Sequence, residues 1–170
     1  MVTVTPSGST TAAVTYTPIA TNTLSSTASS VTFSSIPGTY KDLVVIVAGT
    51  MTTGSTNNVN FQFNGDTGSN YSWTRMLSST TALSSARGTS DLEIDIGILS
   101  STSQSATIAH IQNYSNSTTY KTAIGRGNTS EYVQESVGAW RNTAAITSVK
   151  IQTAAIFSVG TIFTLYGIGA

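Results

Sequence analysis

The chain has 170 residues, seven of them basic and seven acidic, so its formal net charge is zero. A neutral chain lacks the cationic surface on which binding to nucleic acids and anionic membranes depends, and we expect neither partner. The absence of cysteine excludes disulfide bonds and thiolate metal sites, and the length corresponds to one domain.

Hydroxyl side chains make up a third of the sequence, with 31 Thr and 26 Ser. Together with 14 Ile and 12 Val, the threonines give a high content of β-branched residues, which favours strands over helices. The longest apolar run, residues 43–48, is far shorter than the 18 or more residues of a membrane span. Residues 1–6 lack the pattern of a secretory signal peptide. An all-β protein is therefore predicted.

The first third of the chain divides into an arm and several strands. Residues 1–11 are polar and aperiodic and are predicted to form an N-terminal arm, with residues 12–170 as the folded domain. Pro18 restricts a first strand at residues 13–20 to the edge of a sheet. A second strand at 31–36 ends at a Pro-Gly turn, and the continuously apolar segment 43–48 predicts a strand covered on both faces.

The middle of the chain contains the clearest alternation of apolar and polar residues, at 59–63. Asn64 and Gly65 follow directly, and this dipeptide favours a tight hairpin turn. The next strand, 71–77, is followed by a Ser/Thr-rich stretch at 78–90 that is predicted to be a long loop.

Further strands are predicted in the second half of the chain, beginning with the alternating segment 91–98. About ten short strands separated by polar turns favour a single antiparallel β-sandwich of the jelly-roll type. The remaining strand predictions are 106–113, 119–125, 132–140, 146–153 and 161–168.

Residue types that catalyse reactions are scarce. His110 is the single histidine, and it lies within a predicted strand, where a structural role is more common. The sequence contains no nucleophile elbow, phosphate-binding loop or dinucleotide-binding fingerprint. We therefore expect no enzymatic activity, no catalytic residue and no cofactor.

Asp91, Glu93 and Asp95 form the only acidic row. Spacing by two residues would place all three carboxylates on one face of a strand. Such a row could bind a cation or supply the carboxylate pair of a glycosidase. The favoured interpretation is an edge strand whose charges prevent unwanted sheet pairing, so the three residues are only weak metal-site candidates.

Five residues are candidates for an interface. Tyr71, Trp73 and Trp140 could stack on sugar rings or anchor a partner protein. The alternative is that they close the ends of the sandwich, and this is the favoured interpretation for Trp140. Val2 and Val4 alternate with threonines in the arm and could add as a strand to the sheet edge of a neighbour.

Three stretches together resemble small β-sandwich proteins encoded by tailed bacteriophages, notably those of marine and cyanobacterial hosts. These proteins are described as virion structural, tail-fibre-like or capsid-decorating proteins, and the likeness extends over residues 17–168. The stretches are SVTFSSIPGTYKDL at 30–43, QNYSNSTTYKT at 112–122, and GAWRNTAAITSVKIQ at 138–152, the last followed by GTIFTLYGI at 160–168.

The resemblance implies a virion protein made in the host cytoplasm, most simply a capsid decoration (cement) protein bound to the major capsid protein. It also implies a homotrimer, while the uncharged surface itself favours self-association. A tail-fibre or head-fibre tip that recognises a host glycan remains an alternative. A third possibility is a cellular carbohydrate-binding or glycoside-cleaving domain.

Overall fold

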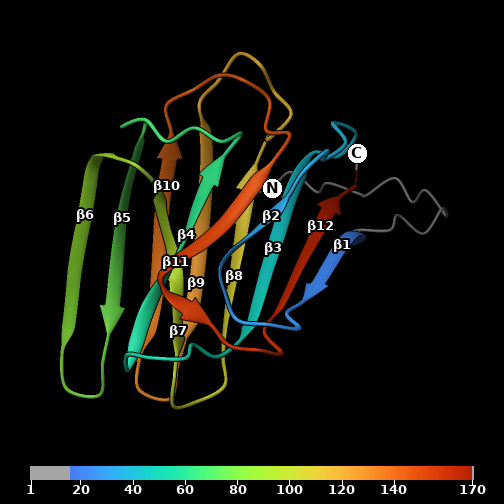
Figure 1. Ribbon diagram of the computed structural model, residues 1–170. Helices are drawn as coiled ribbons and strands as arrows, with labels where there is room; N and C mark the ends of the chain where they lie inside the picture. The colour runs from blue at the N-terminus through green and yellow to red at the C-terminus, as the bar shows by residue number, and fades with distance from the viewer. Residues whose placement is uncertain (1–15, 170) are drawn as a thin grey trace, which may run out of the picture.

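The computed structural model describes residues 16–169, which form twelve β-strands in two antiparallel sheets (Figure 1). Within these residues no helix is long and apolar enough to span a membrane. The predicted arm, with Val2 and Val4, lies outside the described residues. The strands are β1 (Tyr16–Thr23), β2 (Ala28–Phe33), β3 (Asp42–Gly49), β4 (Thr56–Phe63), β5 (Tyr71–Ser78), β6 (Leu83–Asp91), β7 (Ile94–Ser100), β8 (Ser105–Gln112), β9 (Lys121–Asn128), β10 (Val133–Trp140), β11 (Val149–Phe157) and β12 (Ile162–Ile168).

The larger sheet has eight strands in the order β1-β12-β3-β8-β9-β10-β5-β6, and the smaller has four in the order β2-β11-β4-β7. The four-stranded sheet covers one face of the eight-stranded sheet and lies in front of it in Figure 1. This arrangement confirms the predicted all-β sandwich of the jelly-roll type. The opposite face of the eight-stranded sheet carries no second layer within the described residues.

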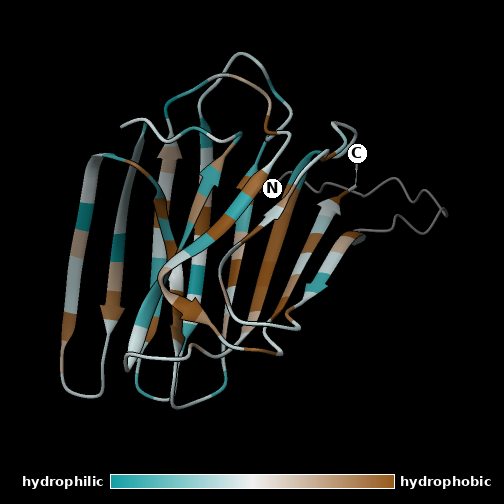
Figure 2. Ribbon diagram, in the orientation of Figure 1, coloured by the Kyte–Doolittle hydropathy of each residue, from teal (hydrophilic) through white to brown (hydrophobic). Residues whose placement is uncertain are grey.

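The core lies between the two sheets. Strand β3 sends Leu43, Val45 and Val47 inward, each no more than 1% exposed, against Phe61 and Ile151 of the smaller sheet and their neighbours. Figure 2 shows β3 as an almost continuous hydrophobic strand. Within the described residues a second layer meets only one of its faces, so the prediction of a strand covered on both faces is wrong. Burial of one such side chain stabilises the fold by about 1.5–3 kcal/mol, so this layer is the main source of cohesion.

Strand β6 corrects the prediction of a long loop at 78–90. It pairs with β5 as a hairpin whose turn is closed by the Ser79 amide donating to the Ala82 carbonyl at 2.8 Å. Its side chains are mostly small, polar and exposed, because β6 is the outermost strand of the eight-stranded sheet. Backbone pairing with β5 therefore creates a strand that side-chain alternation did not indicate.

The turn at Asn64 and Gly65 also differs from its prediction. Both residues have positive φ angles, 53° and 68°, as the dipeptide favours. However, β4 and β5 belong to different sheets, so this turn is a crossing between layers and not a hairpin. The Asn64 side chain stabilises it by accepting the amides of Thr147 at 2.8 Å and Ser148 at 3.1 Å.

The edge position predicted for the first strand is confirmed. Strand β1 pairs only with β12, and its register shifts between Pro18 and Ala20. Proline has no amide hydrogen to donate to a neighbouring strand, so this edge is poorly suited to further pairing.

Candidate functional site

The predicted acidic row does not exist as one surface. Asp91 ends β6 and accepts the indole N–H of Trp73 at 2.9 Å, whereas Asp95 lies on β7 in the other sheet. Glu93, in the turn between them, accepts a hydrogen bond from the Gln152 side-chain amide. Burial raises the pKa of Glu93. Within residues 16–169 no group of three potential ligands could hold a metal ion. The single row on one strand face was therefore a wrong prediction: Asp91 lies on β6, an outermost strand, whereas Asp95 is buried between the sheets.

Asp95 is the centre of a buried polar network between the sheets. Its side chain is 2% exposed and lies 2.5 Å from the Arg75 guanidinium, and its other oxygen accepts the Gln134 amide at 2.7 Å. Burial raises the pKa of Asp95, and the Arg75 charge opposes that shift. Because protein groups already occupy both carboxylate oxygens, this network holds the sheets together and leaves no reactive group open to a substrate.

The aromatic interface candidates are mostly core residues. Tyr71 and Trp140 are no more than 1% exposed and stack with ring centroids 6.4 Å apart, with Phe63 beside them. Their polar atoms bond Asp66, the indole N–H to its carboxylate at 2.7 Å and the phenol to its carbonyl at 2.9 Å. Tyr71 and Trp140 therefore close the sandwich and are not surface anchors. Trp73 is half-buried, with the Arg75 guanidinium 5.5 Å from its ring centroid.

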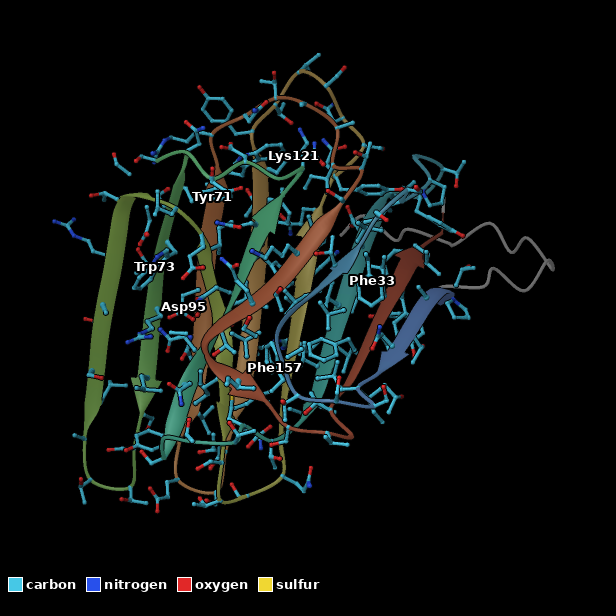
Figure 3. All side chains as sticks on the ribbon, viewed as in Figure 1. Phe33, Tyr71, Trp73, Asp95, Lys121 and Phe157 are labelled. Carbon is cyan, nitrogen blue, oxygen red and sulfur yellow. The ribbon has the colours of Figure 1, made fainter. Side chains whose placement is uncertain are left out.

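The three stretches that carry the phage resemblance meet at one end of the sandwich. The Tyr114 hydroxyl donates to the Pro37 carbonyl, and the Tyr114 carbonyl accepts the Ile146 amide at 2.9 Å. Lys121, labelled with Tyr71 near this end in Figure 3, is fully buried and donates to the Thr143 carbonyl at 2.9 Å. Burial lowers the pKa of Lys121. Tyr114 and Lys121 thus close this end of the fold.

We call the uncovered face of the eight-stranded sheet the open face. The strand registers place five apolar side chains in a continuous diagonal row across five adjacent strands, β3, β8, β9, β10 and β5. Direct or diagonal neighbours on a sheet face are close enough to contact one another. We call this row the apolar diagonal; its members are Ile46, Ile108, Ile124, Val137 and Met76.

Exposed apolar side chains are concentrated on the open face. Among the described residues ten large hydrophobic side chains are exposed, and six of them lie on this face. Scattered single apolar residues are normal on a protein surface, but a contiguous apolar patch indicates an interaction site. The six are Tyr16, Met76, Leu83, Val133, Val137 and Ile162.

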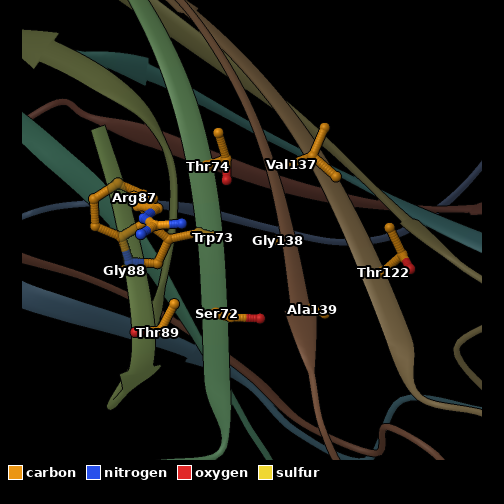
Figure 4. A pocket seen from close by; sticks show the side chains of 10 residues that line it. All are labelled: Ser72, Trp73, Thr74, Arg87, Gly88, Thr89, Thr122, Val137, Gly138 and Ala139. Atoms are coloured by element: carbon orange, nitrogen blue, oxygen red, sulfur yellow. The ribbon is translucent and has the colours of Figure 1, made fainter. Parts of the chain in front are cut away.

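Four shallow hollows follow the apolar diagonal. One of about 490 Å³ adjoins Ile46 and Ile108, and another of about 270 Å³ adjoins Met76 and Val137. Figure 4 shows a third, of about 350 Å³, bordered by Val137, Ser72 and Thr89. On the open face, apolar side chains therefore project beside shallow hollows.

Charged groups of both signs border the diagonal. Arg126 and Glu135 are direct cross-strand partners, yet among the described residues no acidic group lies within 4.0 Å of the Arg126 guanidinium. His110 lies in the neighbouring row and pairs with Asp42 at 3.1 Å. A fourth hollow, of about 150 Å³, is bordered by Tyr16, His110 and Arg126.

Sequence reasoning missed the open face. A signal was present, because apolar residues occupy both alternating positions of β3, and Ile108 and Ile124 are apolar where an exposed strand face is usually polar. Without the strand order, however, nothing in the sequence shows that these residues share one face or that no layer of this chain covers it.

No known family and no characterised protein matches the chain. Among solved structures it is similar to the galectin LEC-6 of Caenorhabditis elegans, with 7% identity and a TM-score of 0.36, covering 88% of this chain and 96% of the galectin. It is also similar to a mutant of the alginate lyase Aly36B in complex with an alginate tetrasaccharide, with 10% identity and a TM-score of 0.27, covering 85% of this chain and 71% of the lyase. TM-scores of this size do not carry a function from one protein to another.

Proposed function

We propose that this chain is a non-enzymatic structural protein of a phage particle, a capsid decoration protein on the outer head surface, and that it acts through its open face. The observation that supports a binding role is the apolar diagonal, which projects Val137 and Met76, 49% and 54% exposed, from strands β10 and β5. Removing such a patch from water against a partner lowers the free energy of the complex.

The groups with perturbed pKa values support a structural role for the interior. Asp95 is engaged by Arg75 and Gln134, and Lys121 by two backbone carbonyls. Shifted pKa values often mark catalytic sites, but Asp95 and Lys121 are enclosed within the fold and already hydrogen-bonded. Asp95 and Lys121 therefore stabilise the sandwich, while the open face carries an apolar patch.

Two features support the placement on a phage head: the three stretches that resemble phage β-sandwich proteins, and the neutral, hydroxyl-rich composition. The test is to purify particles of the phage that encodes the chain and to locate the protein by immunogold labelling. We expect labelling of the head, and lower heat resistance in particles that lack the protein. Labelling of the tail alone, or absence from the particles, would overturn the proposal.

A single pair of variants tests the role of the open face. Val137→Glu places a charge within the apolar diagonal, and Val159→Glu makes the same change at a 60% exposed position in the turn between β11 and β12. Particles that carry the first variant should resemble particles without the protein in heat resistance. Particles that carry the second should resemble the wild type.

A glycan-binding fibre tip is the second candidate, favoured by the hollow bordered by Tyr16, His110 and Arg126. An aromatic ring beside hydrogen-bonding side chains is a common arrangement at sugar sites. This candidate predicts binding to host cell-surface glycan that Arg126→Ala abolishes. Equal binding by the wild type and the variant would exclude this hollow as the site.

A further inference from the structure

We infer that the open face binds the open face of a second copy of this chain, so that two eight-stranded sheets stack about a two-fold axis. The inference rests on the proposed function, in which the open face is the contact surface, and it names the partner. Two copies held on a particle would then be joined to each other, which is one way for a decoration protein to strengthen a shell.

The size of the open face fits a stable pair. Strands about 4.8 Å apart make the eight-stranded sheet roughly 35–40 Å wide, and strands of seven to nine residues are about 25 Å long. The footprint is therefore on the order of 900 Å² per copy. Stable interfaces of standard size bury about 800 Å² on each partner, so the face alone is large enough.

The shape of the open face also fits a second copy of the chain. Two stacked sheets lie about 10 Å apart, and the side chains of their facing surfaces interdigitate. Met76 and Val137 project from β5 and β10, and hollows of about 270 and 350 Å³ lie beside them. A two-fold axis brings projections of one copy toward hollows of the other, because each copy supplies both.

The charges on the face are also self-complementary. A two-fold interface uses the same patch twice, so a patch with one sign of charge would repel its copy. The open face contains adjacent residues of opposite sign, Arg126 and Glu135. Since Arg126 has no acidic partner within 4.0 Å among the described residues, its charge is available to Glu135 of a second copy.

Pairing between sheet edges is the competing arrangement of the same two chains. The β1 edge carries Pro18 and an irregular register, which oppose it. The β6 edge has no proline, and its polar side chains would bury little apolar area. Ser85→Pro removes one backbone donor from β6 and therefore serves as a variant that separates edge pairing from face pairing.

The first experiment measures the mass of the purified full chain by sedimentation equilibrium over micromolar concentrations. Face pairing predicts about twice the 17.6 kDa of one chain. A monomer throughout the range overturns the inference, and a trimeric mass, as the phage resemblance implied, overturns the two-fold arrangement. The head-labelling experiment tests the proposed function independently. A dimer that is absent from the particles would contradict only the proposed function. A monomer that is present on the particles would contradict only the inference of face pairing.

The second experiment uses variants whose folding is confirmed by thermal unfolding. Val137→Glu should weaken self-association by at least about tenfold, whereas its matched control Val159→Glu should leave the association unchanged. Arg126→Glu should also weaken it, and the double variant Arg126→Glu with Glu135→Arg should restore it because the opposite charges are exchanged in both copies. Dimerisation that survives Val137→Glu, or that only Ser85→Pro abolishes, overturns face pairing.

Discussion

Arg75 and Asp95 join the two sheets inside the sandwich, with a guanidinium nitrogen 2.5 Å from a carboxylate oxygen. Arg75 belongs to β5 of the eight-stranded sheet and Asp95 to β7 of the four-stranded sheet. The Asp95 side chain is 2% exposed and that of Arg75 is 21% exposed. Such a pair contributes little net stability, but loss of Arg75 leaves the buried carboxylate without compensation. The pair therefore makes the alignment of the two layers specific.

Arg75→Met should lower the free energy of unfolding by about 3 kcal/mol near neutral pH, because Asp95 must then ionise without its partner or take up a proton. Burial already raises the pKa of Asp95 in the folded state above its model value of 3.8, and loss of Arg75 raises it further. The folded state then binds more protons than the unfolded state, so the variant regains stability as the pH falls toward 3.8. Urea unfolding of wild type and variant at about pH 7 and about pH 4 measures this difference.

The double variant Arg75→Met with Asp95→Leu is the control for that prediction. It removes both charges together, so most of the lost stability should return and the pH dependence should disappear. An equal loss of stability for the single variant at both pH values would contradict the role given to Asp95.

Lys121→Met tests the buried ammonium group at the closed end. Burial lowers the pKa of Lys121 from its model value of 10.5, so below that value the unfolded state binds its proton more tightly. The stability of the wild type relative to Lys121→Met should therefore increase as the pH rises toward 10.5. Thermal unfolding of both proteins across alkaline pH measures the difference, and a constant difference would refute the assignment.

Tyr71→Phe tests the phenol at the crossing between layers. The Phe63 amide donates to this hydroxyl at 3.0 Å, so its removal should cost about 1–2 kcal/mol at neutral pH. Burial raises the pKa of Tyr71 from 10.0 to about 12, so the folded state keeps its proton longer than the unfolded state and the wild type loses stability between these values. The advantage of the wild type over the variant should therefore shrink above pH 10. Tyr120→Phe, at a 61% exposed position, is the matched control and should change little.

Gly125→Ala tests the closest approach between the sheets. A Cβ atom at Gly125 would lie 2.0 Å from the Ile96 carbonyl oxygen, a backbone atom that cannot rotate away. The substitution should lower the free energy of unfolding by about 3 kcal/mol, measured by denaturant titration. Gly38→Ala is the comparison, because its Cβ would only meet the Ser115 Cβ at 3.8 Å, and near-equal losses for the two would argue against this packing.

Local features of the sequence predicted most strands. Strands form at 59–63 and 43–48 as predicted, and the edge position caused by Pro18 agrees with the structure, although the burial of the faces of both strands differs from the prediction. The positive φ angles of Asn64 and Gly65 were also expected from residue type. These features depend on the residue itself and its immediate neighbours, so the sequence alone determines them.

Tertiary structure decided which strands are neighbours and what covers each face. It made a strand of 83–91 through pairing with β5, placed Asp91 and Asp95 in different sheets, and buried Tyr71 and Trp140 instead of exposing them. It also aligned Ile108, Ile124 and Val137 on one uncovered face. Alternation shows that a strand has two faces, but the layer that meets each face comes from segments distant in the chain, and their contacts set the free energy of the arrangement.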